Sequence, residues 1–111
     1  MRIIKSHQND VIILTVEGEV NMTTSPELRN YFLELIKTGH SRLVVDFTKM
    51  AYLDSSGLAT LVECHQNVNE KKGKLSLVNV PEKIKNLFSL TKLDKVFVIF
   101  PSIDSAVSSY S

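Results

Sequence analysis

The densest group of chemically capable side chains in this sequence is Asp54-Ser55-Ser56-Gly57-Leu58. Aspartate and serine directly before an apolar helical pattern can accept hydrogen bonds from the free backbone N–H groups of a helix N-terminus. We therefore expect Asp54 to cap a helix, Gly57 to leave space beside the hydroxyls, and Leu58 to anchor the helix below them. The two serine hydroxyls should be accessible, either as plain capping groups or as acceptors of a phosphate.

Other reactive residues lack the partners that catalysis or metal binding requires. His7, His40, Cys64 and His65 show no metal-ligand spacing, and adjacent residues on a helix point about 100° apart. We expect His65 at the boundary of the core and Cys64 as a partly buried small side chain. The sequence predicts no catalytic residue, no metal site and no cofactor.

Two anion-related alternatives come from the same chain. Asp46 lies near the end of a predicted strand, as a receiver-type phosphoaspartate would, but the acidic pair expected after the first strand is missing. The glycines form no GxGxxG or phosphate-loop array, and Lys71, Lys72 and Lys74 are typical of a solvated helix end. The helix start at Asp54 can nevertheless receive an anion, which keeps a small nucleotide-sensing module as an alternative function.

The elements that must position these residues follow from the apolar pattern, which switches between strand-length runs and helical stripes. Strands are expected over residues 2–5, 11–17, 43–47, 74–80 and 96–100, with Gly18 ending the second and 48–53 forming a loop. The first helix should begin with a capping hydroxyl of Thr24 or Ser25 and stop at Gly39. Further helices should begin near residue 54, as the longest one, and after residues 81 and 102.

This order, ββαβαβαβα, predicts one α/β domain over residues 1–111 with a mixed, mostly parallel sheet flanked by helices. The length of 111 residues and the 43% hydrophobic content suit a single core. Thirteen basic and twelve acidic residues leave a formal charge of +1, too little for a broad field that attracts nucleic acid or a membrane surface. A single cysteine and the lack of a signal-peptide pattern predict a cytoplasmic protein.

Taken in order, these segments resemble the STAS domains of bacterial anti-sigma factor antagonists. The resemblance rests on residues 54–58 following the apolar strand at 44–47, and it covers nearly the whole chain. Supporting segments occur in the family's order at 18–21, 25–28, 72–75 and 84–93. The resemblance implies a mixed sheet with flanking helices and a function without enzymatic activity.

The resemblance also implies a partner switch. The unmodified protein would bind an anti-sigma factor that is also a serine kinase and so free a sigma factor; phosphorylation would end the binding, and a serine phosphatase would restore it. By the family's register the phosphate acceptor is Ser55, with Ser56 as the less favoured substitute, supported by Asp54, Gly57 and Asn21. Asn21 stands where many family members have an aspartate. This departure keeps open a regulatory or scaffold STAS subunit that works without phosphorylation.

The expected partner surface surrounds the phosphate acceptor, so that a new charge of about −1.5 to −2 lies inside or beside the contact. It combines the loop after the second strand with the start and outward positions of the second helix. The residues expected to contact the partner are Thr23, Thr24, Ser25, Ser56, Leu58, Thr60 and Glu63. We expect a monomer or weak dimer with no nucleic-acid or membrane partner.

Overall fold

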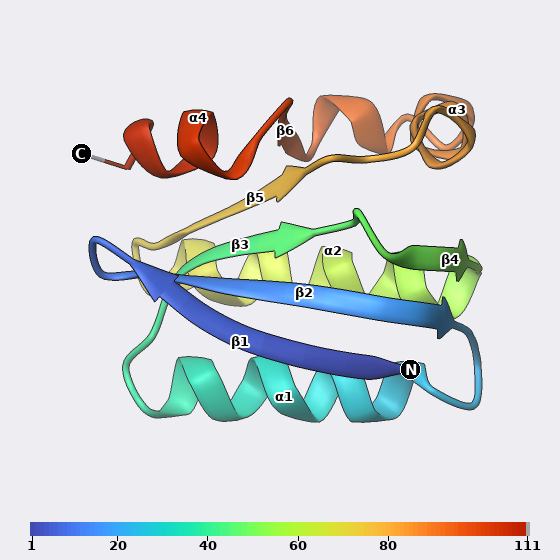
Figure 1. Ribbon diagram of the computed structural model, residues 1–111. Coiled ribbons are helices and arrows are strands. Elements are labelled where there is room, and N and C mark those ends of the chain that lie inside the picture. The colour runs from blue at the N-terminus through green and yellow to red at the C-terminus, as the bar shows by residue number, and fades with distance from the viewer. Residues whose placement is uncertain (111) are drawn as a thin grey trace.

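Six strands form the centre of the structure, a computed structural model that describes residues 1–110 (Figure 1). The strands are β1 (Arg2–Gln8), β2 (Val11–Val20), β3 (Arg42–Asp46), β4 (Met50–Leu53), β5 (Lys74–Val78) and β6 (Val98–Phe100). Five of them follow the order β1-β2-β3-β5-β6, and β4 pairs with β2. Only β1 and β2 are antiparallel to each other; the other pairs are parallel. Strand β1 is therefore an antiparallel edge strand and β3 lies at the centre of the sheet, and the expected mixed, mostly parallel sheet is confirmed.

Residues 1–110 also form four helices and one 3₁₀ turn: α1 (Ser25–Lys37), α2 (Ser55–Glu70), α3 (Glu82–Leu90), η1 (Leu93–Lys95) and α4 (Ile103–Ser108). Helices α1 and α2 pack along each other, and α4 lies apart from both, next to β5 and β6 (Figure 1). Within residues 1–110, no helix combines the length and the apolar character that crossing a bilayer requires.

The near-continuous apolar run of β3 is explained by burial on both faces of the sheet. Leu43 and Val45 point into the main core with side chains of α1, α2 and α3, whereas Val44 points into a second core against α4. A strand covered on both sides needs apolar residues at every position, because successive side chains point to opposite faces. The expected α/β class with flanking helices is confirmed.

The segment from 48 to 53 is not the loop that the sequence predicts. Met50–Leu53 forms β4, which runs parallel to the end of β2, and the element order is therefore ββαββαβαβα. Met50 and Leu53 are both buried although they lie three positions apart. That spacing contradicts strict strand alternation, because the pairing shifts register between Gly18 and Glu19. Gly18 therefore lies inside β2, at φ +89°, instead of ending it.

Helix α1 stops where its glycine predicts. Gly39 has φ +94°, its N–H donates to the Ile36 carbonyl at 3.1 Å, and the His40 N–H donates to the Leu35 carbonyl at 2.8 Å. These two bonds form a Schellman motif, which satisfies carbonyls of the last helical turn. The same bonds hold His40 at a defined place beside the first strands.

Candidate functional site

Asp54 organises the start of α2. Its Oδ1 accepts hydrogen bonds from the Ser56 N–H at 3.0 Å, the Gly57 N–H at 3.2 Å and the Ser56 hydroxyl at 2.5 Å. The Ser56 hydroxyl, together with the backbone N–H groups of Gly57, Ser56 and Met22, holds the pKa of this carboxyl below its usual value. Asp54 is therefore a charged N-cap, as the sequence predicts.

The two neighbouring serines have different environments. Ser56 is half-buried and its hydroxyl is used by the Asp54 carboxylate. Ser55 is exposed, and its side chain makes no hydrogen bond within residues 1–110. Because Ser55 opens the helix, backbone N–H groups of the first turn lie around its position. Of the two hydroxyls expected to be accessible, only that of Ser55 is both exposed and unpaired.

Gly57 serves the packing of α2 rather than the access to the hydroxyls, which corrects the sequence interpretation. A Cβ atom at this position would lie 2.3 Å from Leu53 Cδ1 and 2.9 Å from Val20 Cγ1. Both contacts are shorter than real Cβ atoms tolerate, so a side chain here would push the helix start away from the ends of β2 and β4. Glycine thus allows the Ser55 segment to sit directly on the sheet.

The loop after β2 lies beside this helix start. The Asp54 N–H donates to the Val20 carbonyl at 3.1 Å. Asn21 Oδ1 accepts from the N–H groups of Thr23 at 2.9 Å and Thr24 at 3.1 Å, while the Asn21 N–H donates to the Thr24 hydroxyl at 2.9 Å. An aspartate oxygen would accept the same two bonds. The geometry of the loop therefore does not depend on the charge that Asn21 lacks.

Residue Thr24 occupies the N-cap position of α1 without capping it. Its hydroxyl makes no bond to the first helical turn and donates instead to the Glu19 carbonyl at 2.9 Å. Ser25 is the first residue of the helix itself. The expected hydroxyl cap from one of these two residues is therefore wrong, since the Thr24 hydroxyl closes the 19–24 loop.

Several residues expected to contact a partner are too buried to do so freely. Ser25, Leu58 and Thr60 are each 7% exposed, and the Thr60 hydroxyl bonds back to the Ser56 carbonyl at 3.0 Å. Thr60 is hidden because α2 packs against α1 as well as the sheet, which buries a wider arc than one apolar stripe. Glu63 remains partly exposed but pairs with Arg29 of α1 at 2.6 Å. Thr23 is exposed and Thr24 half-buried.

An apolar groove beside Ser55 was not foreseen from the sequence. It has a volume of about 650 Å³ and lies between β4, the start of α2 and α3. Its lining includes Tyr52, Ser55, Leu58, Leu87 and Leu90. Leu90 is 84% exposed and Tyr52 46%, so the groove carries an exposed apolar patch of the kind that marks binding surfaces.

The loop side of Ser55 also carries an exposed apolar residue. Met22 is 79% exposed, and its backbone N–H lies close enough to the Asp54 carboxylate to help lower the pKa of that group. Flexible Met side chains are common on surfaces that bind other proteins. The signal available in the sequence was an apolar residue inside an otherwise polar turn.

Cys64 is buried and His65 half-buried, and neither is placed for catalysis or metal binding. Burial, with a smaller effect of Glu63, raises the pKa of the Cys64 thiol to about 12, so the thiol stays protonated. The His65 ring packs edge-on against Phe97, with ring centroids 6.0 Å apart. No group of three His, Cys, Asp or Glu side chains in the described part of the chain could hold a metal ion.

Asp46 is closed to modification by its neighbours. It is buried and accepts from the Thr48 hydroxyl at 2.5 Å, the Thr48 N–H at 3.0 Å and Asn79 Nδ2 at 3.1 Å. Burial by itself would raise the pKa of Asp46, but these hydrogen bonds outweigh it and lower the pKa. These three bonds use Oδ1 and join two loops, while Oδ2 accepts from the Thr15 hydroxyl at 3.4 Å and is shielded by the burial of the residue.

Comparison with known proteins places this geometry in a family, because the STAS domain model matches residues 2–106. The chain belongs to the STAS domain family. The anti-sigma-B factor antagonist of Bacillus subtilis (strain 168) is 28% identical over 104 residues, which are 94% of each chain. The crystal structure of an anti-sigma factor antagonist from Mycobacterium paratuberculosis has a TM-score of 0.87 at 25% identity, covering 97% of this chain and 92% of that one. Bacillus SpoIIAA in its phosphorylated form has a TM-score of 0.77 at 14% identity, over 99% of this chain and 100% of that one.

These relatives confirm the STAS resemblance and the fold class of the chain. An antagonist acts by binding another protein, so relatives of this kind agree with a regulator that is not an enzyme. The single domain boundary at residues 1–111, the cytoplasmic location and the roles of the individual site residues stay predictions.

Proposed function

We propose that this STAS protein is an anti-sigma factor antagonist whose binding is switched off by phosphorylation of Ser55. The unmodified form binds an anti-sigma factor with serine kinase activity and thereby releases a sigma factor. A serine phosphatase returns the protein to the binding form. The observation that carries the proposal is the exposed, unpaired Ser55 hydroxyl between an ordered charged cap and an apolar groove.

The shape of the site supports a kinase substrate. A kinase must reach the hydroxyl oxygen, and Ser55 lies on the surface at the first position of α2. The bonds that Asp54 accepts from Ser56 and Gly57 hold the backbone on either side, so the hydroxyl is presented without local refolding. Bacillus SpoIIAA, which has the same fold, exists in a phosphorylated form.

The surroundings of Ser55 support a protein partner. Leu90 and Tyr52 line the groove beside Ser55 and are exposed. Met22, in the loop after β2, is also exposed. Apolar side chains of this size drive association when a partner covers them. We therefore assign the partner footprint to Met22, Thr23, Tyr52, Ser55 and Leu90, and not to the buried Ser25 and Thr60.

Phosphate at this position would affect the complex more than the fold. About 1.5 to 2 added negative charges would lie beside the charged Asp54 and among apolar groups that a partner must desolvate. The free N–H groups and dipole of the helix start would partly stabilise the phosphate in the uncomplexed protein. A hundredfold loss of affinity requires only about 2.7 kcal/mol, which like-charge repulsion in an interface can supply.

The proposal is tested by incubating the protein with ATP and an anti-sigma factor kinase, then measuring intact mass and mapping the site. Wild type should gain one phosphate on Ser55, and Ser55→Ala should gain none. Ser55→Asp should bind the kinase at least about a hundredfold more weakly than wild type in calorimetry. Asn30→Asp, which adds the same charge on the exposed face of α1, should bind as wild type does.

Other results assign the protein differently. A phosphate on Ser55→Ala would overturn the choice of serine. Unchanged partner binding by Ser55→Asp, with no phosphate gained by wild type, would favour the regulatory or scaffold STAS subunit. Heat released on titration with nucleotides in the absence of any partner would favour the nucleotide-sensing module.

A further inference from the structure

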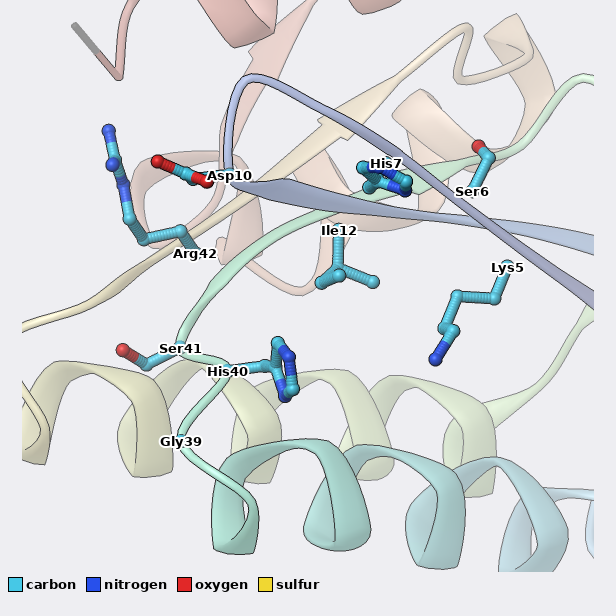
Figure 2. Close-up of a pocket in the computed structure, with 9 residues that line it drawn as sticks. All are labelled: Lys5, Ser6, His7, Asp10, Ile12, Gly39, His40, Ser41 and Arg42. Atoms are coloured by element: carbon cyan, nitrogen blue, oxygen red, sulfur yellow. The ribbon is translucent and has the colours of Figure 1, made fainter.

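A second cavity lies at the opposite end of the sheet from Ser55. It is open to solvent, has a volume of about 590 Å³ and is bordered by β1, the turn after it and the segment 39–42, with Lys5, His7 and His40 exposed (Figure 2). Strand β2 passes the cavity at Ile12 and ends at Val20, whose carbonyl accepts the N–H of Asp54. Eight strand residues separate these points by roughly 26 Å. A ligand here would leave the Ser55 face free.

Basic side chains from two distant parts of the sequence line this cavity. They are Lys5, His7, His40 and Arg42, and Figure 2 shows Ile12 between the two histidines. The pairing of Lys5 with Leu14 and of His7 with Ile12 places both basic residues on the face of β1 that looks toward α1. The cavity thus contains two of the three histidines of the chain.

Most of these cations are not used by the fold. Within residues 1–110, the side chains of Lys5 and His7 make no hydrogen bond and no ion pair. Arg42 differs, because its guanidinium donates to the Tyr110 carbonyl and lies 5.6 Å from the centroid of the Tyr110 ring. The groups available to a ligand are therefore Lys5, His7 and His40.

The hydrogen bonds around His40 determine which ring nitrogen faces the cavity. The Thr38 hydroxyl directs its one hydrogen at the Glu34 and Leu35 carbonyls, so we assign His40 Nδ1–H as the donor to Thr38 Oγ1, 3.1 Å away. Neutral His40 then has a bare Nε2, which repels an anion, and only protonation makes Nε2 a donor. The carbonyls of the last α1 turn accept hydrogen bonds from Thr38, Gly39 and His40. They are therefore not free oxygens that would repel an anion.

The charges around the cavity balance while the histidines are neutral. Lys5 and Arg42 are offset by Asp10 in the cavity wall and by Glu34, which lines an adjoining hollow with Lys5, His40 and Tyr31. Protonation of both histidines leaves an excess of two positive charges. The attraction for an anion should therefore arise when the two histidines are protonated.

We propose that this cavity is an acid-gated anion site, which binds a small molecule carrying a sulfate or phosphate group when His7 and His40 are protonated. The two excess charges match a dianion, and Lys5 Nζ, a His7 ring N–H and His40 Nε2–H supply donors from both walls. Ile12, 8% exposed, forms an apolar floor for the body of the ligand.

The test titrates the full chain with sodium sulfate and follows backbone amide shifts by NMR. Sulfate keeps its double charge at neutral and mildly acidic pH, so a change in affinity reports the protein alone. We expect the signals of residues 5–7 and 39–42 to move, with affinity about tenfold higher near pH 5.5 than near pH 8. Sodium chloride at the same ionic strength should move none of them.

Three variants decide whether the named side chains are responsible. The double variant His7→Gln and His40→Gln should remove the difference between the two pH values. Lys5→Glu should weaken binding at both, whereas Lys85→Glu, the same charge change on the exposed face of α3, should bind sulfate as wild type does. Equal affinity at both pH values, a pH difference retained by the double histidine variant, or equal effects of the two lysine changes would each overturn the proposal. Phosphorylation of Ser55 is measured in parallel and should be the same in all of these variants.

Discussion

Two aspartates in this protein make the same local turn and have opposite roles. Asp46 Oδ1 accepts from the Thr48 N–H at 3.0 Å and hydroxyl at 2.5 Å, and Asp54 Oδ1 accepts from the Ser56 N–H and hydroxyl at the same two distances. The difference lies in the residue between each pair. Phe47 is fully buried, whereas Ser55 is exposed. An Asp-x-Ser/Thr turn therefore presents a side chain for chemistry only where the middle residue faces solvent.

The largest expected contrast is in stability at the two middle residues. Phe47→Ala should lower the free energy of unfolding by about 3–5 kcal/mol, because it leaves a cavity in the main core. Ser55→Ala should change it by less than about 0.5 kcal/mol. Urea unfolding followed by circular dichroism measures both. A similar loss in the two variants would break the comparison.

The next largest effect is expected at Gly57, which lets the start of α2 pack closely against the sheet. Gly57→Ala should cost about 1–3 kcal/mol, because its Cβ would overlap Leu53 and Val20. Urea unfolding gives the cost, and NMR shifts of residues 52–56 report whether the helix start has moved. Gly39→Ala is not a suitable control, because Gly39 has a positive φ that alanine adopts only with strain. Asn30→Ala, on an exposed face of α1, is the suitable control. An unchanged unfolding midpoint for Gly57→Ala would contradict the packing role.

The dependence of stability on pH should distinguish the two carboxylates. Both have a pKa lowered from 3.8 in the folded protein, so each contributes stability that is present above that pH and lost as the pH falls below it. We expect Asp46→Asn to flatten the fall in the urea midpoint between about pH 5 and 3 more than Asp54→Asn, since solvent screens Asp54. Equal flattening by the two variants would count against the difference in burial.

A small effect is expected at Ser56, the serine that supports the cap. Ser56→Ala removes the hydroxyl bond to Asp54 but keeps both backbone bonds, so stability should fall by no more than about 1 kcal/mol. The variant should still gain one phosphate, on Ser55, when incubated with ATP and the kinase. Loss of that phosphate in a protein of normal stability would make Ser56 part of the acceptor.

Prediction from the sequence succeeded where the signal is local. The Asp54 cap and the Gly39 stop depend on bonds between residues that are few positions apart, and the apolar run at 43–47 predicts a strand by composition alone. These local signals left both Ser55 and Ser56 as candidates; the choice of Ser55 as phosphate acceptor comes from the STAS resemblance and stays a prediction. The STAS resemblance added the function that these local signals do not contain.

Prediction failed where distant segments decide the environment. Strand β4 forms because the end of β2 extends past its pairing with β3 and offers a free edge, which no pattern within 50–53 encodes. Thr60 is hidden by the neighbouring α1, and the Thr24 hydroxyl is taken by Glu19 across the loop. The groove beside Ser55 needs α3, some thirty residues further along the chain, to form its second wall.

The amino-acid sequence by itself determined the helix starts and stops, the apolar strand at 43–47, and the charged cap next to Ser55, because short-range hydrogen bonds and apolar periodicity specify them. Only the tertiary structure decided which of two equivalent aspartate turns is open, what lies beside Ser55, and that Lys5, His7 and His40 share one cavity. The physical reason is that exposure and the meeting of charges depend on which surfaces pack together across the sheet. Those contacts join residues that are far apart along the chain.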